Sequence, residues 1–208
     1  MYLALTSDHS TPHGKAAIQS VISDALSDQT VFSVTYFASQ PDPGLFFFNS
    51  VELFYRALGA VHVHYVDSNT SQIDIEQALN ASLIHLSGGD TFAFLSWLQE
   101  RSLLDTLNRL ARDGKPFVGV SAGAMLMTPS IESAPLCGDK NEVGIQNLFA
   151  LDLAPFLFVP HAEKNQQEIE RVFQLLSQKR HQVVLCTDDD ALVIKNDEVI
   201  EFGTPLWV

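Results

Sequence analysis

The sequence has few basic residues. Its 208 residues include 12 Lys and Arg against 25 Asp and Glu, which gives a formal net charge of −13. A charge excess of this sign repels phosphate backbones and anionic lipid headgroups. We therefore expect neither nucleic acid nor a membrane surface as a partner.

Cysteines and long apolar runs are also scarce. The two cysteines, Cys137 and Cys186, lack CxxC spacing, so they predict neither a disulfide framework nor a metal or redox site. No run of about 18 apolar residues is present. Residues 1–6 lead directly into a polar segment without a basic leader, which predicts a cytoplasmic chain.

The sequence does contain enough apolar residues for a core. Hydrophobic residues make up 46% of the chain and charged residues 18%, a balance that excludes a disordered chain. A chain of this length typically forms one domain, and we expect a single domain over residues 1–208. Short β-branched segments alternate with longer amphipathic ones, which is typical of βα units around a mainly parallel sheet.

The predicted elements alternate in the same way along the chain. The first strands are expected at residues 2–5, 31–37, 61–66, 83–86 and 117–120. Apolar residues recur at helical spacing over residues 15–26, 45–58, 73–79 and 92–112, the last stretch divided into two helices near 99–102. Gly59 and Gly114 are predicted to end helices.

The pattern changes after residue 120. It predicts a helix over residues 166–178 and strands at 156–160, 183–186, 191–195 and 199–202. Asn196-Asp197 predicts a tight hairpin between the last two strands. The longest connections are expected at residues 39–44 and 128–141, which are rich in Pro, Gly, Ser and Asp.

The strongest chemical signal is a serine between a strand and a helix, in the segment Gly119-Val120-Ser121-Ala122-Gly123. A nucleophile elbow needs this order, because a sharp turn lifts the serine oxygen clear of the sheet and small neighbours avoid collisions. The following helix start offers N–H groups to an oxyanion. The alternative is a tight turn without chemistry, and the flanking context favours the catalytic interpretation.

Two of the seven histidines follow Ser121 and are candidates for its base. His161 ends the apolar run 156–160, so it would share a sheet rim with Ser121 if that strand runs parallel in the same sheet. His181 lies in a polar turn, where a surface position is favoured.

The remaining histidines give weaker signals. His62 and His64 alternate along one predicted strand, and because no third ligand is evident we favour a structural or surface role over a metal pair. His85 lies within an apolar strand and is predicted to be a hydrogen-bonded core residue.

A triad also needs an acid that orients the imidazole. Asp188, Asp189 and Asp190 follow the predicted strand 183–186, and any of the three is a candidate. The alternative is a solvated acidic turn. Gly88 and Gly89 follow another strand and precede a helix, so their backbone N–H groups are candidates for a second oxyanion donor.

Three segments stand out together: Ser87-Gly88-Gly89-Asp90-Thr91-Phe92, the run from Gly114 to Ala124 that contains the serine, and Pro160-His161. They resemble the aspartyl dipeptidase (peptidase E) and cyanophycinase family of serine peptidases, and the resemblance extends over most of the chain. It implies an α/β fold with a flavodoxin-like, doubly wound, mainly parallel sheet, like that of class I glutamine amidotransferases. The C-terminal hairpin would be added to it.

Carried over by motif, the resemblance implies a role for each site residue. Ser121 would be the nucleophile and His161 the general base, with the N–H groups of Gly89 and Ala122 as the oxyanion hole. The family's catalytic glutamate aligns with Asp188, with Asp189 and Asp190 as neighbouring alternatives. Asp90 matches an Asn or Asp that lines the family's substrate pocket. The order Ser, His, acid differs from that of α/β-hydrolases, in which the acid precedes the histidine.

One position departs from the family. Aspartyl dipeptidases place an arginine at the start of the helix after the histidine, where it pairs with an acidic substrate side chain. Glu168 aligns with this arginine, and Arg171 lies three residues later. The departure argues against a preference for Asp-Xaa dipeptides.

These observations predict a serine exopeptidase that hydrolyses dipeptides or short peptides through an acyl-enzyme. The expected partner is a small peptide substrate, and the mechanism needs no metal or organic cofactor. The alternatives are a catalytically silent binding domain of the same fold, or an esterase or amidase that uses the same triad. Association into a homo-oligomer stays open.

Overall fold

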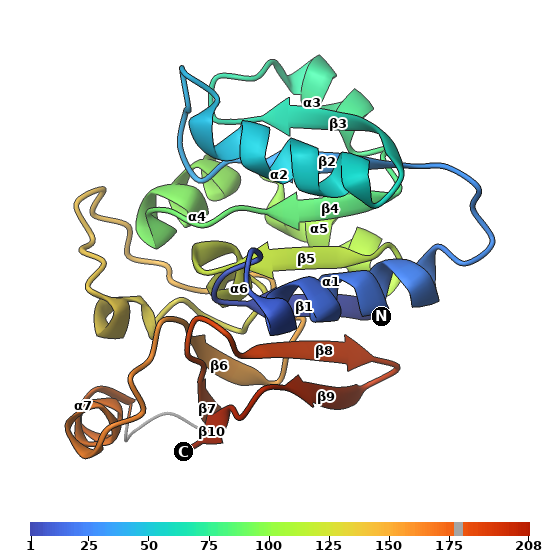
Figure 1. Cartoon of the computed structure of the whole chain (residues 1–208). Coiled ribbons are helices and arrows are strands. Elements are labelled where there is room, and N and C mark those ends of the chain that lie inside the picture. The colour runs from blue at the N-terminus through green and yellow to red at the C-terminus, as the bar shows by residue number, and fades with distance from the viewer. Residues whose placement is uncertain (177–180) are drawn as a thin grey trace.

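A seven-stranded sheet forms the centre of the computed structural model, which describes residues 1–176 and 181–208 (Figure 1). In spatial order its strands are β3 (Ala60–Val66), β2 (Phe32–Phe37), β4 (Leu83–Leu86), β5 (Phe117–Val120), β1 (Tyr2–Thr6), β8 (Ala191–Lys195) and β9 (Glu198–Phe202). The first five are parallel, whereas β8 and β9 are antiparallel additions at one edge. The carboxyl ends of the five parallel strands therefore meet at one edge, where ligands bind in such sheets.

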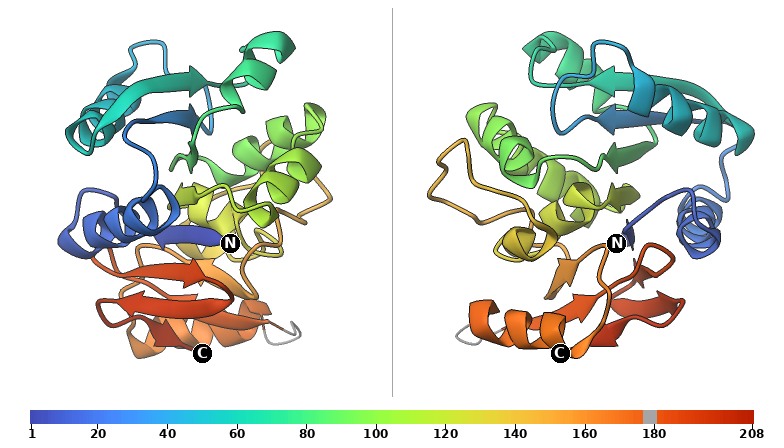
Figure 2. Two further views of the ribbon diagram at one scale, coloured as in Figure 1. Left: turned by 90° about the vertical axis from the view of Figure 1, so that its right-hand side faces the viewer. Right: turned by 60° about the vertical axis from the view of Figure 1, so that its left-hand side comes forward.

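Helices cover both faces of this sheet (Figure 2). One face carries α1 (Pro12–Ala25) and α2 (Phe46–Ala57), and the other carries α3 (Gln72–Ala78), α4 (Thr91–Glu100), α5 (Leu104–Arg112) and α6 (Ala122–Leu126). Each face has its own buried apolar cluster, one containing Ile18 and Tyr55 and the other containing Leu95 and Leu107. The chain therefore has the doubly wound, mainly parallel architecture that the sequence predicts.

Local signals define the ends of the helices. Gly59 and Gly114 follow α2 and α5 with φ of 100° and 99°, the left-handed region that glycine adopts without a steric penalty. The predicted helix ends at both glycines are confirmed. α1 begins three residues before the predicted start, because the Thr11 side chain accepts a hydrogen bond from the Gly14 N–H and Pro12 occupies the first turn.

A second, three-stranded sheet is formed by β6 (Phe156–Val159), β7 (Gln182–Leu185) and β10 (Leu206–Trp207), with α7 (Gln166–Leu176) packed against it. β6 is parallel to β7 and, among the described residues, has no partner in the large sheet. The expectation that His161 shares a rim of the same sheet with Ser121 is therefore wrong. A short apolar run predicts a buried strand but contains no information about the strand with which it pairs.

The antiparallel strands β8 and β9 form the predicted C-terminal hairpin. Asn196 and Asp197 occupy its turn with φ of 49° and 67°, as a type I′ turn requires at both central positions. The helix predicted over residues 166–178 corresponds to α7, and its last two predicted residues, 177–178, lie outside the described residues. A short 3₁₀ helix, η1 (Ala134–Cys137), and an isolated bridge between Ser130 and Phe149 lie in the long connection before β6.

Two further features of the fold are the lengths of its helices and the burial of its two cysteines. None of the helices in residues 1–176 or 181–208 is long and apolar enough to cross a membrane. Cys137 and Cys186 are free thiols. Burial raises the pKa of both, that of Cys137 to about 12, which keeps them protonated and unreactive.

Asp190 fastens the loop between β7 and β8. Its carboxylate accepts hydrogen bonds from the N–H and hydroxyl of Thr187 and from the N–H of Thr204, each at 2.7 Å, and it pairs with the ammonium of Lys164. Burial alone would raise the pKa of Asp190, but these donors outweigh it and lower the pKa below the ordinary value of 3.8. The carboxylate therefore stabilises the fold where it is ionised.

We predict that Asp190→Ala lowers the free energy of unfolding at pH 7 by about 3 kcal/mol, because Lys164 and the N–H donors lose their acceptor. The folded-state pKa is lowered, so this contribution is present above pH 4 and is lost as the pH falls through the folded-state value. Urea unfolding of the wild type and the variant at pH 7 and pH 3 measures the loss of stability and its dependence on pH. The exposed Asp28→Ala is the control. An equal loss of stability at both pH values would contradict the prediction.

Candidate active site

Ser121 lies at the junction between β5 and α6, at the carboxyl edge of the large sheet. Its φ of 50° and ψ of −109° are a strained conformation for a residue with a side chain. Two backbone hydrogen bonds hold the turn: the Ser121 N–H donates to the Thr6 carbonyl at 2.8 Å, and the Gly123 N–H donates to the Ser87 carbonyl at 2.9 Å. The turn is thus fixed to both strands that flank β5.

The two glycines of the GxSxG segment are needed for close packing. A Cβ on Gly123 would lie 2.1 Å from the Leu86 carbonyl oxygen, and one on Gly119 would lie 2.6 Å from the Gly123 oxygen. Both contacts are far inside van der Waals distance and are made with backbone. The small residues around Ser121 therefore let α6 start directly against β4.

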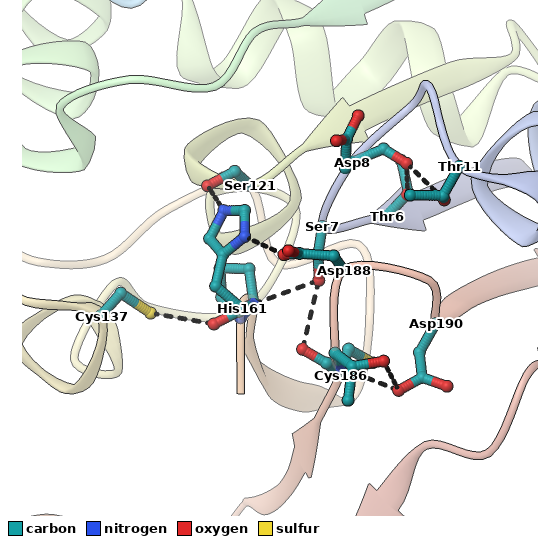
Figure 3. Close-up of polar contacts among 12 residues, drawn as sticks. Thr6, Ser7, Asp8, Thr11, Ser121, Cys137, His161, Cys186, Asp188 and Asp190 are labelled. Atoms are coloured by element: carbon teal, nitrogen blue, oxygen red, sulfur yellow. Dashed lines mark hydrogen bonds and ion pairs between the residues drawn. The ribbon is translucent and has the colours of Figure 1, made fainter. Parts of the chain in front are cut away.

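His161 and Asp188 complete a Ser-His-Asp arrangement (Figure 3). The His161 Nε2 lies 2.9 Å from the Ser121 Oγ, and its Nδ1 lies 2.6 Å from an Asp188 carboxylate oxygen. His161 follows β6 with a φ of 58°, so it too is in a conformation that a fold must enforce. The structure brings together the three residues that the sequence analysis selected.

The three consecutive aspartates have separate positions. Asp188 faces His161, whereas Asp189 accepts a hydrogen bond from the His13 N–H at the start of α1 and lies 3.1 Å from the His13 Nδ1. Asp190 is buried, and its carboxylate bonds to Thr187, Thr204 and Lys164 as described above. Of the alternatives that the sequence left open, Asp188 alone contacts the imidazole within the described residues.

This arrangement is open to solvent. The side chains of His161 and Asp188 have exposed fractions of 48% and 68%. Water screens the interaction between two side chains that are this exposed, so it contributes little to the stability of the fold. A ligand that covers the two side chains would lower the local dielectric and strengthen their interaction.

Ser7 joins the histidine to the large sheet, and the sequence analysis missed this role. Its hydroxyl accepts a hydrogen bond from the His161 N–H and donates one to the Cys186 carbonyl, both at 3.3 Å. Ser7 directly follows β1, which is the neighbour of β5 in the sheet. Only this strand order, which local sequence patterns do not reveal, brings Ser7 to the site.

The glycine turn after β4 lies beside the serine. A Cβ on Gly88 would be 3.4 Å from the Ser121 Cβ, and Gly89 has a φ of 121°. Ala122 is the first residue of α6, where a helix N–H has no intrahelical acceptor. Gly88 thus lies against the serine, Gly89 lines the cavity beside it, and Ala122 directly follows it; the oxyanion roles of Gly89 and Ala122 stay predictions.

Asp90 has a clear local contact. Its side chain accepts a hydrogen bond from the Ala93 N–H at 2.8 Å and so forms the N-cap of α4. It is absent from the described lining of the cavity beside Ser121. Its role in substrate binding stays a prediction.

The other histidines lie outside the Ser-His-Asp arrangement. His85 is 1% exposed and lies 2.9 Å from the Tyr55 hydroxyl through its Nδ1, so the prediction of a hydrogen-bonded core residue is confirmed. His62 and His64 pack against each other on β3, and no group of three metal-ligating side chains occurs in the described part of the chain. His181 is exposed, as predicted.

A cavity of about 410 Å³ opens beside Ser121. It extends from the serine toward α2, between the loops that follow β1, β2 and β4. Its lining is formed by Ser7, Asp8, His9, Tyr36, Ala38, Ser39, Gln40, Pro41, Asp42, Pro43, Phe47, Ser50, Val51, His85, Ser87, Gly88, Gly89, Val120, Ser121 and His161. A cavity of this volume suits a small ligand or a short peptide segment.

Glu168 and Arg171 do not reach this cavity. The Glu168 carboxylate accepts a hydrogen bond from the Lys164 N–H at 2.8 Å in the first turn of α7. Arg171 is exposed on the same helix, beside a separate depression near η1. Neither side chain is placed to meet a substrate group held in the cavity.

The fold and the site together define the class of protein: an α/β protein with a serine-hydrolase type of site on a doubly wound sheet. Comparison with known families is more specific, because the profile of peptidase family S51 matches residues 3–202. The chain belongs to peptidase family S51.

Curated proteins named peptidase E are similar to part of this chain in sequence. Peptidase E of Nostoc sp. is 30% identical over 99 residues, which are 48% of this chain and 38% of that protein. Peptidase E of Escherichia coli K12 is 32% identical over 104 residues, or 47% and 44% of the two chains. The matched region thus spans less than half of the length of these curated relatives.

Solved structures resemble the chain over almost its whole length. A Listeria monocytogenes EGD-e protein assigned as a peptidase E superposes with a TM-score of 0.75 at 22% identity, covering 98% of both chains. A peptidase from an acI-B1 actinobacterium gives a TM-score of 0.72 at 17% identity and covers 98% of this chain and 87% of its own. At these identities the likeness shows a shared fold.

We predict that Gly123→Ala lowers the free energy of unfolding by about 2–3 kcal/mol, because the new methyl group meets the Leu86 backbone. It should also abolish labelling of the serine by a fluorophosphonate probe. Gly44→Ala is the matched control, since its Cβ would meet only the exposed ring of Phe46, which can move. Equal effects of the two substitutions in urea unfolding and labelling would contradict the prediction.

Proposed function

We propose that this protein is a serine peptidase that hydrolyses dipeptides or short peptides through an acyl-enzyme. The observation that carries the proposal is the chain of contacts from the Ser121 Oγ through His161 to Asp188, at 2.9 Å and 2.6 Å. Membership of peptidase family S51 supports the choice of a peptide as substrate.

In the proposed first step, the Ser121 Oγ attacks the carbonyl carbon of the scissile peptide bond. The His161 Nε2 accepts the hydroxyl proton as the oxygen–carbon bond forms. His161 then gives this proton to the leaving amine as the carbon–nitrogen bond breaks. Asp188, which accepts a hydrogen bond from the Nδ1–H, keeps the ring in the required tautomer and stabilises the imidazolium.

The second step is hydrolysis of the acyl-enzyme. His161 removes a proton from a water molecule, whose oxygen attacks the ester, and returns the proton to the Ser121 Oγ when the acid is released. In both steps negative charge develops on the carbonyl oxygen. The N–H groups of Gly89 and Ala122 are the proposed donors to it, and such donors act mainly on the transition state.

The cavity supports a small substrate. Its volume of about 410 Å³ is in the range of small-molecule sites and adjoins the serine directly. The strained turns at Ser121 and His161 favour a catalytic site over a silent binding domain, since a binding function does not require strain at these two positions. An esterase or amidase would use the same three side chains, and substrate comparison separates these activities.

A fluorophosphonate probe tests the nucleophile. We expect the wild-type chain to be labelled at one serine, and Ser121→Ala to abolish both labelling and peptide hydrolysis. Intact-mass and peptide-mapping spectrometry identify the site. His161→Ala should lower kcat by at least about 10³-fold, because the hydroxyl loses its base. Labelling that persists in Ser121→Ala would overturn the assignment, and absence of labelling in the wild type would favour a binding domain.

Two neighbouring carboxylates test the acid of the triad. We expect Asp188→Asn to lower kcat by about 10²- to 10⁴-fold with little change in KM, because the amide favours the wrong tautomer of His161. Asp189→Asn has the same change in charge one residue away and should leave kcat within about threefold. A larger effect at Asp189 than at Asp188 would show that the resting geometry does not identify the acid.

A further inference from the structure

The charged side chains in the lining of the cavity beside Ser121 restrict the kind of substrate side chain that it can bind. Within the described residues its lining contains the carboxylates of Asp8 and Asp42 and contains neither lysine nor arginine. A substrate carboxylate bound there would lose its hydration without gaining an ion pair, which is strongly unfavourable. The lining therefore disfavours an acidic side chain.

His9 and His85, which line the cavity together with His161, do not replace the missing cation. His85 is 1% exposed, stacks on Tyr36 with ring centroids 5.1 Å apart, and bonds to the Tyr55 hydroxyl. Burial lowers its pKa well below the ordinary value, and burial also lowers the pKa of His9. Both rings are neutral at pH 7, so they present aromatic surface rather than charge.

The two carboxylates already have donors from the protein. Asp42 accepts hydrogen bonds from the N–H groups of Phe47 and Phe48 at the start of α2. One oxygen of Asp8 accepts a hydrogen bond from the Ser10 N–H at 2.7 Å. A cationic substrate side chain is therefore not needed to balance an isolated buried charge in the cavity.

Most of the remaining lining is apolar. Tyr36, Val51 and Val120 are buried, and Phe47 lies at the opening with 76% of its surface exposed. An exposed aromatic ring at a cavity opening gains most from a ligand that covers it with apolar surface. The buried and the exposed parts of the lining thus both favour an apolar substrate side chain.

Of the two carboxylates in the cavity lining, Asp8 is the one that adjoins the Ser-His-Asp arrangement along the chain. It directly follows Ser7, whose hydroxyl accepts a hydrogen bond from the His161 N–H (Figure 3). Asp42 lies farther along the lining, in the loop after β2. Repulsion of an acidic group beside the scissile bond therefore comes mainly from Asp8.

We propose that this cavity binds the side chain of the residue that supplies the scissile carbonyl, and that it selects uncharged apolar side chains and rejects acidic ones. Asp8 is the residue that discriminates against acidic substrates, and Phe47 covers the apolar ones. The proposal rests on the peptidase function proposed above and assigns its substrate class.

The test compares 4-nitroanilides of Leu, Phe, Asp and Lys. Leu and Asp are similar in size and differ mainly in charge. We expect the wild-type chain to hydrolyse the Leu substrate with a kcat/KM on the order of 100-fold above that of the Asp substrate. Asp8→Asn, which keeps an oxygen for the Ser10 N–H, should reduce this ratio about tenfold. Asp24→Asn, a remote change of the same charge, is the control.

A ratio makes the test independent of folding. If Asp8 had only a structural role, Asp8→Asn would lower kcat/KM equally for the Leu and Asp substrates and leave their ratio unchanged. That result would overturn the assignment of Asp8. Preference for Asp or Lys in the wild type would overturn the proposed class. If fluorophosphonate labels Ser121 but none of the four substrates is hydrolysed, the cavity assignment fails alone. If labelling and hydrolysis are both absent, the proposed function itself fails.

Two adjacent phenylalanines test the apolar contact. Phe46 and Phe47 are 80% and 76% exposed, but only Phe47 belongs to the described lining. We expect Phe47→Ala to lower kcat/KM for the Phe substrate about tenfold and to leave the Asp substrate within about twofold, while Phe46→Ala changes neither. Equal losses in both variants, or for both substrates, would overturn the role of Phe47.

Discussion

The geometry of the site depends on one hydroxyl group that joins two sheets. Ser121 belongs to the large sheet, whereas His161 and Asp188 follow strands of the three-stranded sheet. The Ser7 hydroxyl, at the end of β1, bonds to the backbone of His161 and of Cys186. Apolar packing supports this link, since residues of β6 and β7 share a buried cluster with α6. The distances between Ser121, His161 and Asp188 are therefore kept only if the two sheets hold their relative position.

Because the site residues come from two sheets, only some features of the site could be predicted from the sequence. The strand 117–120, the elbow around Ser121 and the helix ends at Gly59 and Gly114 depend on neighbours in the chain, so local patterns predicted them. The sheet to which β6 belongs depends on contacts with β7, more than twenty residues away. Apolar periodicity is the same for either sheet, and for this reason the rim expected for His161 was wrong although the histidine itself faces Ser121.

The consecutive aspartates show the same limit at the level of single side chains. Asp188, Asp189 and Asp190 are chemically identical, and the sequence could nominate all three. The structure separates them by partners that come from distant parts of the chain: His161, His13, and Thr204 with Lys164. Ser7 and Asp8 were missed for a related reason, since a serine and an aspartate after a strand carry no signal until the order of strands is known.

The exposure of His161 and Asp188 bears on the proposed choice of substrate. The side chains of His161 and Asp188 are 48% and 68% exposed, so water screens their interaction. In the proposed mechanism, a substrate seated in the cavity would displace that water from one side, and the bound peptide itself would supply the low dielectric in which the imidazolium is stabilised. An acidic group would work against this, because it brings a second negative charge beside Asp8 at the moment when the oxyanion forms. An apolar group removes water without adding charge, so the chemistry proposed for Ser121 and the side chain proposed for the cavity follow from the same electrostatic requirement.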